Sequence, residues 1–332
     1  MTQTLTKRAA PAGRPAPARL ARAKRRRHRL LVLGLMAPAI IGFTVFFIYP
    51  LFATVYFSFT RYDLITPPQF VGLRNYRFFF FEDPNSWQSV RNTLWFVVFM
   101  VPARVAFALL IAQMLTRIRR GGGLFRTVFY LPALTPPVAA TIAFAFLFNP
   151  GTGVVNRFLA WLGVEGPLWL NDPQWSKPVL LALGVWGLGD ILIIFLAALL
   201  DVPAEQYEAA SIDGANAIQQ FRYITLPTIS PVLLFAGIIG VIQMLCYFTQ
   251  AVVASSLASG QATVGGGQGM YLGYPDGSTL TYPLWMYQMG FKNFFLGYAA
   301  AMAVLLFVVA MAFTAFLLRR SEAFVHGAEG AR

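Results

Sequence analysis

The stretch EQYEAASIDGANAIQQFRYITLP, residues 205–227, is polar, yet long apolar runs lie on both sides of it. It predicts a short helix that begins at about Pro203, because proline is tolerated in a first helical turn. Glu205 and Glu208 lie near the start of that helix, where the helix dipole favours acidic side chains. Gly214 can adopt backbone conformations closed to other residues, so a second short helix can leave at an angle. Residues 205–227 are therefore predicted to form an ordered polar loop between two apolar segments.

The composition of the chain is that of a membrane protein. Of its 332 residues, 57% are hydrophobic and only 12% are charged, whereas about a quarter of the residues of a soluble domain are charged. The net charge of +13 could indicate nucleic acid, but ten of the 26 basic residues lie in residues 7–29, directly before the first apolar run. Such basic flanks are ordinary in membrane proteins. The predicted partner is therefore the lipid bilayer, and no nucleic acid is expected.

Six apolar stretches of about 20 residues predict six membrane-spanning helices. They cover residues 31–57, 93–115, 127–148, 179–200, 230–255 and 295–318. The first is too long for the apolar core of a cleaved signal peptide, so it is predicted to be retained. In the third, Pro132, Pro136 and Pro137 predict a kinked or broken helix.

The distribution of lysine and arginine predicts the orientation of the spans. With the N-terminus in the cytoplasm, the cytoplasmic segments hold 18 of these residues and the opposite side holds seven, so both termini and the polar loop are predicted to be cytoplasmic. The basic leader 1–30 lacks an apolar face and is predicted to be disordered; a membrane domain covers 31–320, and 321–332 form a tail. On the opposite side, the glycine-rich segment 256–294 could contact a partner or act as a flexible linker.

No residue cluster in the sequence predicts catalysis or a metal site. The chain has two histidines, His28 and His326, and one cysteine, Cys246, which are too few for a histidine or thiolate metal cluster. The glycines at 121–123 and 265–267 are not followed by the Gly-Lys-Ser/Thr sequence that cradles the phosphates of a nucleotide. The chain is therefore not expected to be an enzyme or to bind a cofactor. Any uphill movement must draw its energy from an ion gradient or from another subunit.

Two ionisable side chains, Arg104 and Asp190, lie inside predicted spans. Each costs about 2.5–3.5 kcal/mol at a helix centre, so charges within the membrane are usually functional. Asp190 lies near Gly184, Gly187 and Gly189, which leave room for a ligand or for a close helix. Its carboxylate could accept hydrogen bonds from two hydroxyl groups of a sugar, or it could pair with Arg104 or another polar group of the bundle. The sequence alone leaves both interpretations open.

Three further polar side chains fall within the predicted fifth span. Gln243, Tyr247 and Gln250 are spaced by four and three residues, which would place them on one face of a helix. They could line a hydrophilic path through the membrane or form hydrogen bonds to neighbouring helices.

Residues 203–227 resemble, position by position, the loop that defines the permease subunits of binding-protein-dependent ABC importers. The loop of that family contains Glu-Ala-Ala, then a glycine after three residues, and ends in Ile-x-Leu-Pro. The matching residues here are Glu208, Ala209, Ala210, Gly214, Ile224, Leu226 and Pro227. The form of the loop found in sugar importers is matched by Tyr207, Asp213, Ala215, Gln219 or Gln220, and Phe221.

Other segments also resemble the carbohydrate-importer permeases, whose members carry maltose, glycerol phosphate or trehalose. They are FVGLRNYRFFF after the first span, RNTLWFVVFMVPARVAFALLIAQML in the second and GGGLFRTVFYLPALTPPV entering the third. Residues 248–255, FTQAVVAS, depart from the pattern of the family, because Thr249 replaces an acid, Ser255 replaces a threonine and the following Gly-Gly-Pro is missing.

The resemblance implies an all-α integral membrane protein of the bacterial cytoplasmic membrane, with the six-span fold of type I ABC importers. It implies that residues 203–227 form the coupling helix between spans 4 and 5, which docks into a cytoplasmic ATPase. The implied partners are a second six-span permease, two ATPase subunits that use ATP and magnesium, and an extracytoplasmic sugar-binding protein. In the related maltose permease, positions near Gly187 and Asp190 contact the sugar.

Two alternatives compete with a sugar importer. An ABC permease for a non-sugar solute, such as a peptide, an amino acid or a lipid-linked compound, would share the loop, although the Asp-Gly-Ala and Phe-x-x-Ile-Thr-Leu-Pro details favour sugars. A secondary transporter would be expected to contain inverted repeats and ionisable relays across several spans, and the sequence contains neither.

Overall fold

The structure is a computed structural model that describes residues 18–118, 120–260 and 272–329. The start of the predicted leader, the glycines at 265–267 and the end of the predicted tail lie outside the described residues. The chain divides into two compact units, Met1–Thr54 and Val55–Arg332.

The described part of the first unit, residues 18–54, is one long helical segment. α1 (Ala18–Phe43) continues into the π-helical turn η1 (Thr44–Ile48) and then into α2 (Tyr49–Ser58), which enters the second unit. Because α1 begins at Ala18, the part of the leader from residue 18 to residue 30 is helical, although the prediction assigned it to a disordered segment. Alanine, leucine, arginine and lysine dominate that part of the leader, and all four are good helix formers.

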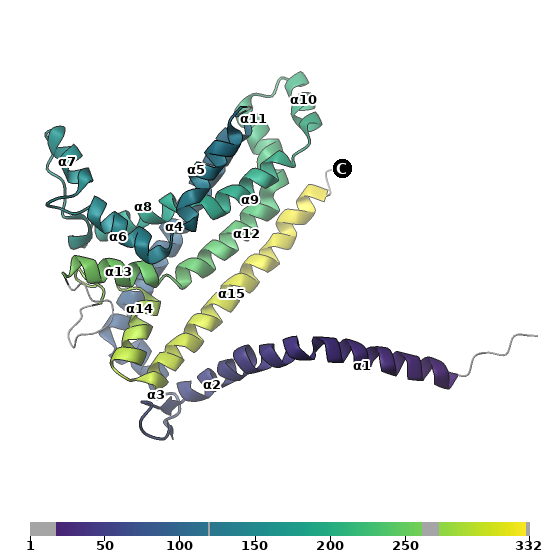
Figure 1. The fold of residues 1–332 in the computed structure, drawn as a ribbon, viewed down its shortest axis with the longest axis vertical. Helices are drawn as coiled ribbons and strands as arrows, with labels where there is room; N and C mark the ends of the chain where they lie inside the picture. Colours follow the sequence, from purple (N-terminus) through teal and green to yellow (C-terminus); the bar gives the residue numbers. More distant parts are fainter. Residues whose placement is uncertain (1–17, 119, 261–271, 330–332) are drawn as a thin grey trace, which may run out of the picture. The chain divides into compact units, whose positions relative to one another are not determined.

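The second unit is helical, except for one antiparallel pair of two-residue strands among its described residues. The strands are β1 (Thr60–Arg61) and β2 (Gln69–Phe70). The first helices are α3 (Arg74–Arg77), η2 (Phe78–Glu82), α4 (Pro84–Thr116), α5 (Gly122–Leu134), α6 (Pro137–Leu147), α7 (Val154–Trp161), η3 (Trp169–Asn171), α8 (Ser176–Trp186) and α9 (Gly189–Leu200). The remaining helices are α10 (Ala204–Ile212), α11 (Ala217–Gln220), η4 (Phe221–Thr225), α12 (Leu226–Leu245), α13 (Thr249–Ala258), α14 (Tyr282–Tyr287), η5 (Gln288–Lys292) and α15 (Leu296–Glu329) (Figure 1).

The described residues contain six candidate membrane spans. By length and apolar composition, four segments can each cross a membrane: Leu31–Ser58, Pro84–Thr116, Ala217–Leu245 and Leu296–Arg319. Two helix pairs, α5 with α6 and α8 with α9, pass the same test together, and each pair is bent, by 97° and 46° respectively. When each bent pair counts as one span, the total agrees with the six spans predicted from the sequence.

The bend in the third span lies at the predicted prolines. α5 and α6 are separated by Thr135 and Pro136, and both residues have extended backbone ψ angles, of 128° and 134°. A residue that precedes a proline is pushed toward extended backbone, so Pro136 and Pro137 together stop the helix. Pro132 lies inside α5 and does not end it.

The predicted fifth span is wrong at its outer end. α12 ends at Leu245, and a separate helix, α13, begins at Thr249. Tyr247, in the turn between them, is buried with its ring 4.8 Å from that of Phe96. The carbonyl of Tyr247 accepts a hydrogen bond of 2.8 Å from the Thr281 hydroxyl. Burial of the ring and capture of the freed carbonyl stabilise this turn, and hydropathy alone does not indicate either interaction.

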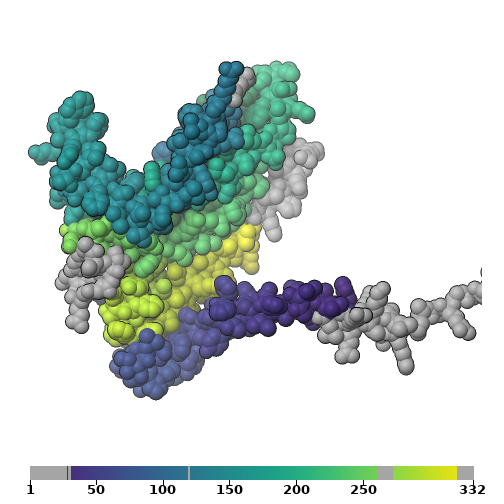
Figure 2. All heavy atoms as spheres, viewed as in Figure 1, coloured from purple at the N-terminus to yellow at the C-terminus, as the bar shows by residue number. Residues whose placement is uncertain are grey.

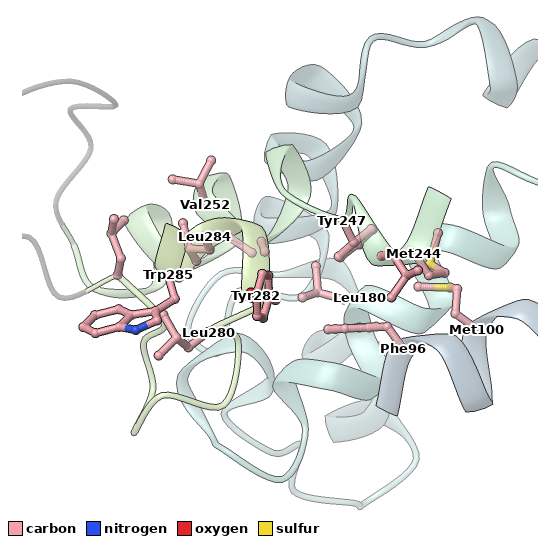
Figure 3. Close-up of a cluster of buried hydrophobic side chains, with 14 of the residues drawn as sticks. Phe96, Met100, Leu180, Met244, Tyr247, Val252, Leu280, Tyr282, Leu284 and Trp285 are labelled. Carbon is pink, nitrogen blue, oxygen red and sulfur yellow. The ribbon is translucent and has the colours of Figure 1, made fainter. Parts of the chain in front are cut away.

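The described part of the glycine-rich segment 256–294 is not a flexible linker. Its side chains Leu272, Leu280, Tyr282, Leu284, Trp285 and Met289 are buried in the same core as residues of α4, α8 and α12 (Figure 3). Asn92 of α4 donates from Nδ2 to the carbonyl of Leu280 at 2.9 Å. Apolar burial and hydrogen bonds to its backbone therefore fix residues 272–294 against the spans.

Asp83 fastens the start of α4 to the last helices of the chain. Its carboxylate is 5% exposed. Oδ2 accepts hydrogen bonds from Ser86 Oγ at 2.7 Å, from Trp285 Nε1 at 2.7 Å and from the Tyr298 hydroxyl at 2.5 Å. A buried charge is tolerated only when it is paired or hydrogen-bonded, so these donors make the position stable. The sequence analysis did not identify Asp83, because an acid before a first-turn proline is typical of an ordinary helix cap.

Candidate functional site

A polar cluster lies between three membrane-spanning helices. Arg104 extends from α4, Asp190 from α9 and Gln243 from α12, and these helices pack against one another. The Arg104 guanidinium donates from Nη2 to Asp190 Oδ1 at 2.9 Å and from Nη1 to Gln243 Oε1 at 2.9 Å. Nη2 also lies 3.5 Å from the carbonyl oxygen of Gly187. The cluster therefore joins three helices through hydrogen bonds from one charged group.

Apolar packing holds these helices together on the side of the cluster that faces the 203–227 loop. Ala108 and Ala112 of α4 are fully buried against Leu192 and Phe195 of α9 and against residues of α12. Small residues at helix contacts let helix backbones approach closely. The positions of the three polar side chains are thus set by helix packing that does not itself depend on their charges.

The two charged groups of the cluster differ in exposure. Arg104 is 9% exposed, whereas the side chain of Asp190 is 44% exposed. Within the described residues, Oδ2 of Asp190 receives no hydrogen bond and Nε of Arg104 has no partner. The cluster thus presents one free carboxylate oxygen on its open side, while the guanidinium is enclosed.

The break between α8 and α9 sets the position of Asp190. This residue lies in the first turn of α9, directly after the 46° bend, where the helix dipole favours an acid. A β-carbon on Gly189 would lie 2.7 Å from the carbonyl oxygen of Phe129, and one on Gly184 would lie 2.2 Å from a side chain of α4. A β-carbon on Gly187 would have no neighbour nearer than 3.7 Å. Two of the three glycines therefore permit close helix packing, and at Gly187 a β-carbon would make only ordinary van der Waals contacts.

Of the two interpretations of Asp190 drawn from the sequence, the structure confirms the ion pair with Arg104. Contact between Asp190 and a substrate stays a prediction. No group of three or more His, Cys, Asp or Glu side chains in the described part of the chain could hold a metal ion.

The prediction that Gln243, Tyr247 and Gln250 share one helical face is wrong. α12 ends before Tyr247, and Gln250 lies in α13, after the chain has turned. Tyr247 is 4% exposed, and its hydroxyl has no partner within the described residues. Gln243 is exposed and Gln250 is half-buried. The turn after α12 therefore separates the three side chains, and Gln243 is the one that contacts Arg104.

Residues 203–227 form two short helices, as predicted. α10 follows Pro203, and Gly214 has a φ of +81°, a left-handed conformation that is strained for residues with a β-carbon. α11 begins with a capping box, in which the side chains of Asn216 and Gln219 each accept a hydrogen bond from the backbone N–H of the other, at 2.9 and 2.8 Å. These two features hold the loop in one shape.

The 203–227 loop is fastened to the fifth span. The hydroxyl groups of Tyr207 and Thr225 share a hydrogen bond of 2.9 Å, and Thr225 is buried. The Tyr207 ring packs against the apolar core between α4, α9 and α12. α11, η4 and α12 form one continuous helical segment, Ala217–Leu245. A displacement of the loop is therefore passed to α12.

The outer surface of the loop exposes apolar side chains. Ile212, Ile218 and Tyr223 are 87%, 78% and 70% exposed. The region lies at one tip of the second unit in the space-filling view (Figure 2). Among the residues that match the family pattern, the exposed ones are Glu208, Ala209, Asp213, Gly214, Gln219 and Pro227, and the partly buried ones are Tyr207, Ala210, Ala215, Gln220, Phe221, Ile224 and Leu226. The sequence analysis missed the three apolar side chains, although large apolar residues in a polar loop indicate an interaction surface.

Comparisons with known proteins agree on one family. Residues 104–323 match the family model described as "Binding-protein-dependent transport system inner membrane component". The chain is 36% identical over 303 residues to the probable ABC transporter permease protein YesP of Bacillus subtilis, with 91% of this chain and 93% of that protein covered. It is 32% identical over 296 residues to the arabinooligosaccharides transport system permease protein AraP of Halalkalibacterium halodurans, with 88% of each covered. A chain of a bacterial alginate ABC transporter, solved in complex with an alginate pentasaccharide-bound periplasmic protein, has a similar fold, with a TM-score of 0.75 at 22% identity over 91% of this chain and 97% of that one.

Proposed function

The chain belongs to the family of binding-protein-dependent transport system inner membrane components, the permease subunits of ABC importers, and from this premise we propose that its cargo is a carbohydrate. A relative that shares 32% of its residues over 88% of both chains is named for transport of arabinooligosaccharides. The sugar-importer form of the 203–227 loop, with Tyr207, Asp213 and Ala215, supports the same cargo class. A permease for a non-sugar solute is the alternative that the cargo experiment below must exclude.

The 203–227 loop serves as the coupling element to an ATPase subunit. Its exposed apolar residues, Ile212, Ile218 and Tyr223, offer the surface that a protein partner would bury. Gly214 and the capping box at α11 fix the shape of the loop before any partner binds, which lowers the entropy cost of docking. ATP and magnesium are used by the ATPase subunits and not by this chain.

The polar cluster lines part of the substrate path. Asp190 has one carboxylate oxygen that accepts no hydrogen bond from the described residues, and its side chain is 44% exposed. A carboxylate held in this way can accept hydrogen bonds from sugar hydroxyls, while Arg104 keeps it oriented. Gln243 offers an amide next to it. Tyr247 is buried in the core, and Gln250 would reach the path only from α13, so both are weaker candidates for contact with substrate.

The complete importer contains three kinds of partner in this proposal. A second six-span permease completes the path, two ATPase subunits bind beneath the pair, and an extracytoplasmic binding protein delivers the sugar. The charge distribution supports cytoplasmic termini and a cytoplasmic coupling loop. ATP-driven closure of the ATPase dimer would then act on the loop and change the side to which the path opens.

The exposed apolar surface of the preformed loop carries the coupling proposal, and site-specific crosslinking tests it. A photoreactive amino acid is placed at Ile212, which is 87% exposed, and in a control at Ile65, which is 86% exposed at the other end of the second unit. The Ile212 variant is expected to crosslink to a nucleotide-binding subunit encoded with the permease, and the Ile65 variant is not. Equal crosslinking from both positions would contradict the proposal.

The cargo class is tested on the secreted partner, because affinity for the solute resides in the binding protein of such systems. Isothermal titration calorimetry of the binding protein encoded beside this chain is expected to detect binding of oligosaccharides and no binding of amino acids or peptides. Uptake of the same labelled sugar by cells should then require this permease. Binding of a non-sugar solute alone would establish the alternative.

A further inference from the structure

A cavity lies at the end of the second unit opposite the 203–227 loop. Its volume is about 320 Å³, which falls in the range of small-molecule sites. Its walls come from β1, α3 and the start of α15 (Figure 1). The lining combines two arginines, Arg61 and Arg74, with the aromatic rings of Tyr62, Phe78 and Phe295. This combination suits a ligand that has both a negative charge and an apolar body.

Neither arginine of the cavity has an acidic partner within the described residues. The ion pairs found there are Arg104 with Asp190 and Arg77 with Glu82. Asp63, two residues after Arg61, accepts hydrogen bonds from the backbone N–H groups and the side chain of its own turn. Two guanidinium groups that line one cavity repel each other unless an anion lies between them. The cavity therefore favours an anionic ligand.

Close backbone contacts build the walls of the cavity. Asn75 donates from Nδ2 to the carbonyls of Ser58 and Thr60 at 2.8 and 2.9 Å, which fixes α3 against the end of α2. The backbone N–H of Gly297 donates to the carbonyl of Tyr62 at 3.2 Å, and a β-carbon on Gly297 would lie within 2 Å of the Thr60 carbonyl oxygen. A glycine is required at this point for α15 to approach β1. The cavity is a formed part of the fold and does not depend on a ligand to shape it.

The cavity lies at the level where two candidate spans end. The first span ends at Ser58 and the last begins at Leu296. Large apolar side chains are exposed on the short segments beside it, outside these spans; they are Leu64, Ile65, Phe70, Leu73, Phe294 and Phe295. Aromatic and apolar residues next to basic residues at span ends are typical of the membrane interface. The position of the cavity therefore matches the headgroup layer of a bilayer, with the apolar residues toward the acyl chains.

We propose that this cavity binds the phosphate headgroup of an anionic phospholipid between Arg61 and Arg74, while the lipid acyl chains lie along the exposed apolar residues beside it. A guanidinium binds phosphate oxygens through two parallel hydrogen bonds. In a headgroup with net negative charge, such as that of phosphatidylglycerol, no cation neutralises the phosphate, so both arginines can interact with its charge. A zwitterionic headgroup adds a cation that the two arginines repel. The site thus selects anionic over zwitterionic phospholipids and is independent of the sugar path and of the coupling loop.

Native mass spectrometry of the full-length chain with its copurifying subunits tests the site. Samples in detergent receive phosphatidylglycerol or phosphatidylcholine of the same acyl chains, and a third arm receives phosphatidylglycerol with excess inorganic phosphate. The wild type is expected to retain phosphatidylglycerol selectively. The Arg61→Gln/Arg74→Gln variant should bind it about fivefold more weakly for each guanidinium removed. Arg77→Gln is the matched control, because Arg77 is exposed in the same segment but pairs with Glu82 outside the cavity.

Several results would overturn the proposal. They are equal retention of the two lipids by the wild type, unchanged retention of phosphatidylglycerol by the double variant, and complete displacement by inorganic phosphate, which would make the site one for free phosphate. A double variant that loses capture of the binding protein but keeps the lipid would assign the arginines to a protein contact instead. Should the double variant fail to fold, a photoreactive phosphatidylglycerol is added to the wild type, and its adducts should map to the segments that hold Arg61, Arg74 and Phe295. Adducts confined to the middle of the spans would refute the site.

Discussion

Loss of Asp190 should destabilise the protein more than loss of Arg104, because the two partners of the ion pair differ in exposure. Asp190→Leu leaves a guanidinium that is 9% exposed, with the amide of Gln243 as its remaining side-chain partner. Removal of one partner from a buried ion pair costs about 3–5 kcal/mol, and the partial exposure of Asp190 places the cost near the lower end, at about 3 kcal/mol. Arg104→Met instead leaves a carboxylate whose side chain is 44% exposed and can be hydrated. The cost of that change should be about 1 kcal/mol, as for a largely solvated pair.

Removal of both charges should restore most of the stability. The Arg104→Met/Asp190→Leu variant replaces the pair by apolar groups of similar size, a change that is often neutral or stabilising in buried sites. We expect the double variant to lie within about 1 kcal/mol of the wild type. The two single changes would then show an interaction energy of about 3–5 kcal/mol, which helix packing alone would not produce.

Thermal unfolding of the full-length protein, followed by tryptophan fluorescence in one detergent, ranks the stability of the wild type, the two single variants and the double variant. Asp190→Leu should unfold at the lowest temperature, Arg104→Met at a slightly reduced one, and the double variant close to the wild type. Equal losses in the two single variants, or a double variant as unstable as Asp190→Leu, would refute the reasoning from exposure. Sugar uptake by the stable double variant then separates the two roles of Asp190. Lost uptake places the carboxylate in the substrate path, and normal uptake restricts it to structure.

Three further substitutions test the loop and the packing of the spans. Gly214→Val should abolish uptake while the protein still folds, because a β-branched residue is strained at a φ of +81°, whereas Gly123→Ala, at an open glycine with ordinary φ, should leave uptake unchanged. Gly189→Ala should destabilise the protein by about 1–3 kcal/mol in thermal unfolding, because its methyl group meets the backbone of α5, while Gly187→Ala should not. Asp83→Ala should cost about 3 kcal/mol, because it leaves buried Trp285 Nε1 without an acceptor and leaves the Ser86 and Tyr298 hydroxyls only each other; a variant as stable as the wild type would contradict that role.

Hydropathy was sufficient to predict the number of spans, when each bent helix pair counts as one span. It did not predict every turn within the spans or the packing between them, as particular residues show. The break at Pro136 and Pro137 follows from proline geometry and could be predicted locally. The turn after Leu245 could not, because it depends on the burial of Tyr247 against Phe96, a residue more than 140 positions earlier in the chain. The segment from residue 272 to 294 resembled a linker in composition, yet its glycines connect side chains that fill the core. Such long-range burial leaves no periodic signal in one short segment.

Part of the candidate site could be predicted from the sequence, because charged side chains inside a membrane are rare. Arg104 and Asp190 stood out in the sequence for that reason, but their pairing with Gln243 depended on a 46° bend at Gly187 that no proline signals. The cavity between Arg61 and Arg74 was not found at all. Arginines in loops are ordinary in sequence, and only the approach of Gly297 to β1 brings the two sides of that cavity together.

The same helix connects the two sites to which the sequence drew attention. The segment Ala217–Leu245 begins inside the 203–227 loop, where Tyr207 is bonded to Thr225, and carries Gln243 at its far end, where the amide accepts from Arg104. From Thr225 to Gln243 this segment rises about 27 Å at 1.5 Å per residue, so the loop and the ion pair are joined by one rigid element. In the proposed importer, force applied to the loop by an ATPase would therefore act on the hydrogen bond at Gln243, and through Arg104 on Asp190, without any need for a chain of small side-chain adjustments. α9 could change its angle at the bend near Gly187, and Asp190, which lies directly after the bend, would move with it. Cargo recognition and ATPase coupling would then be linked mechanically, because the partly exposed carboxylate of Asp190 is held by the same guanidinium that Gln243 of α12 contacts.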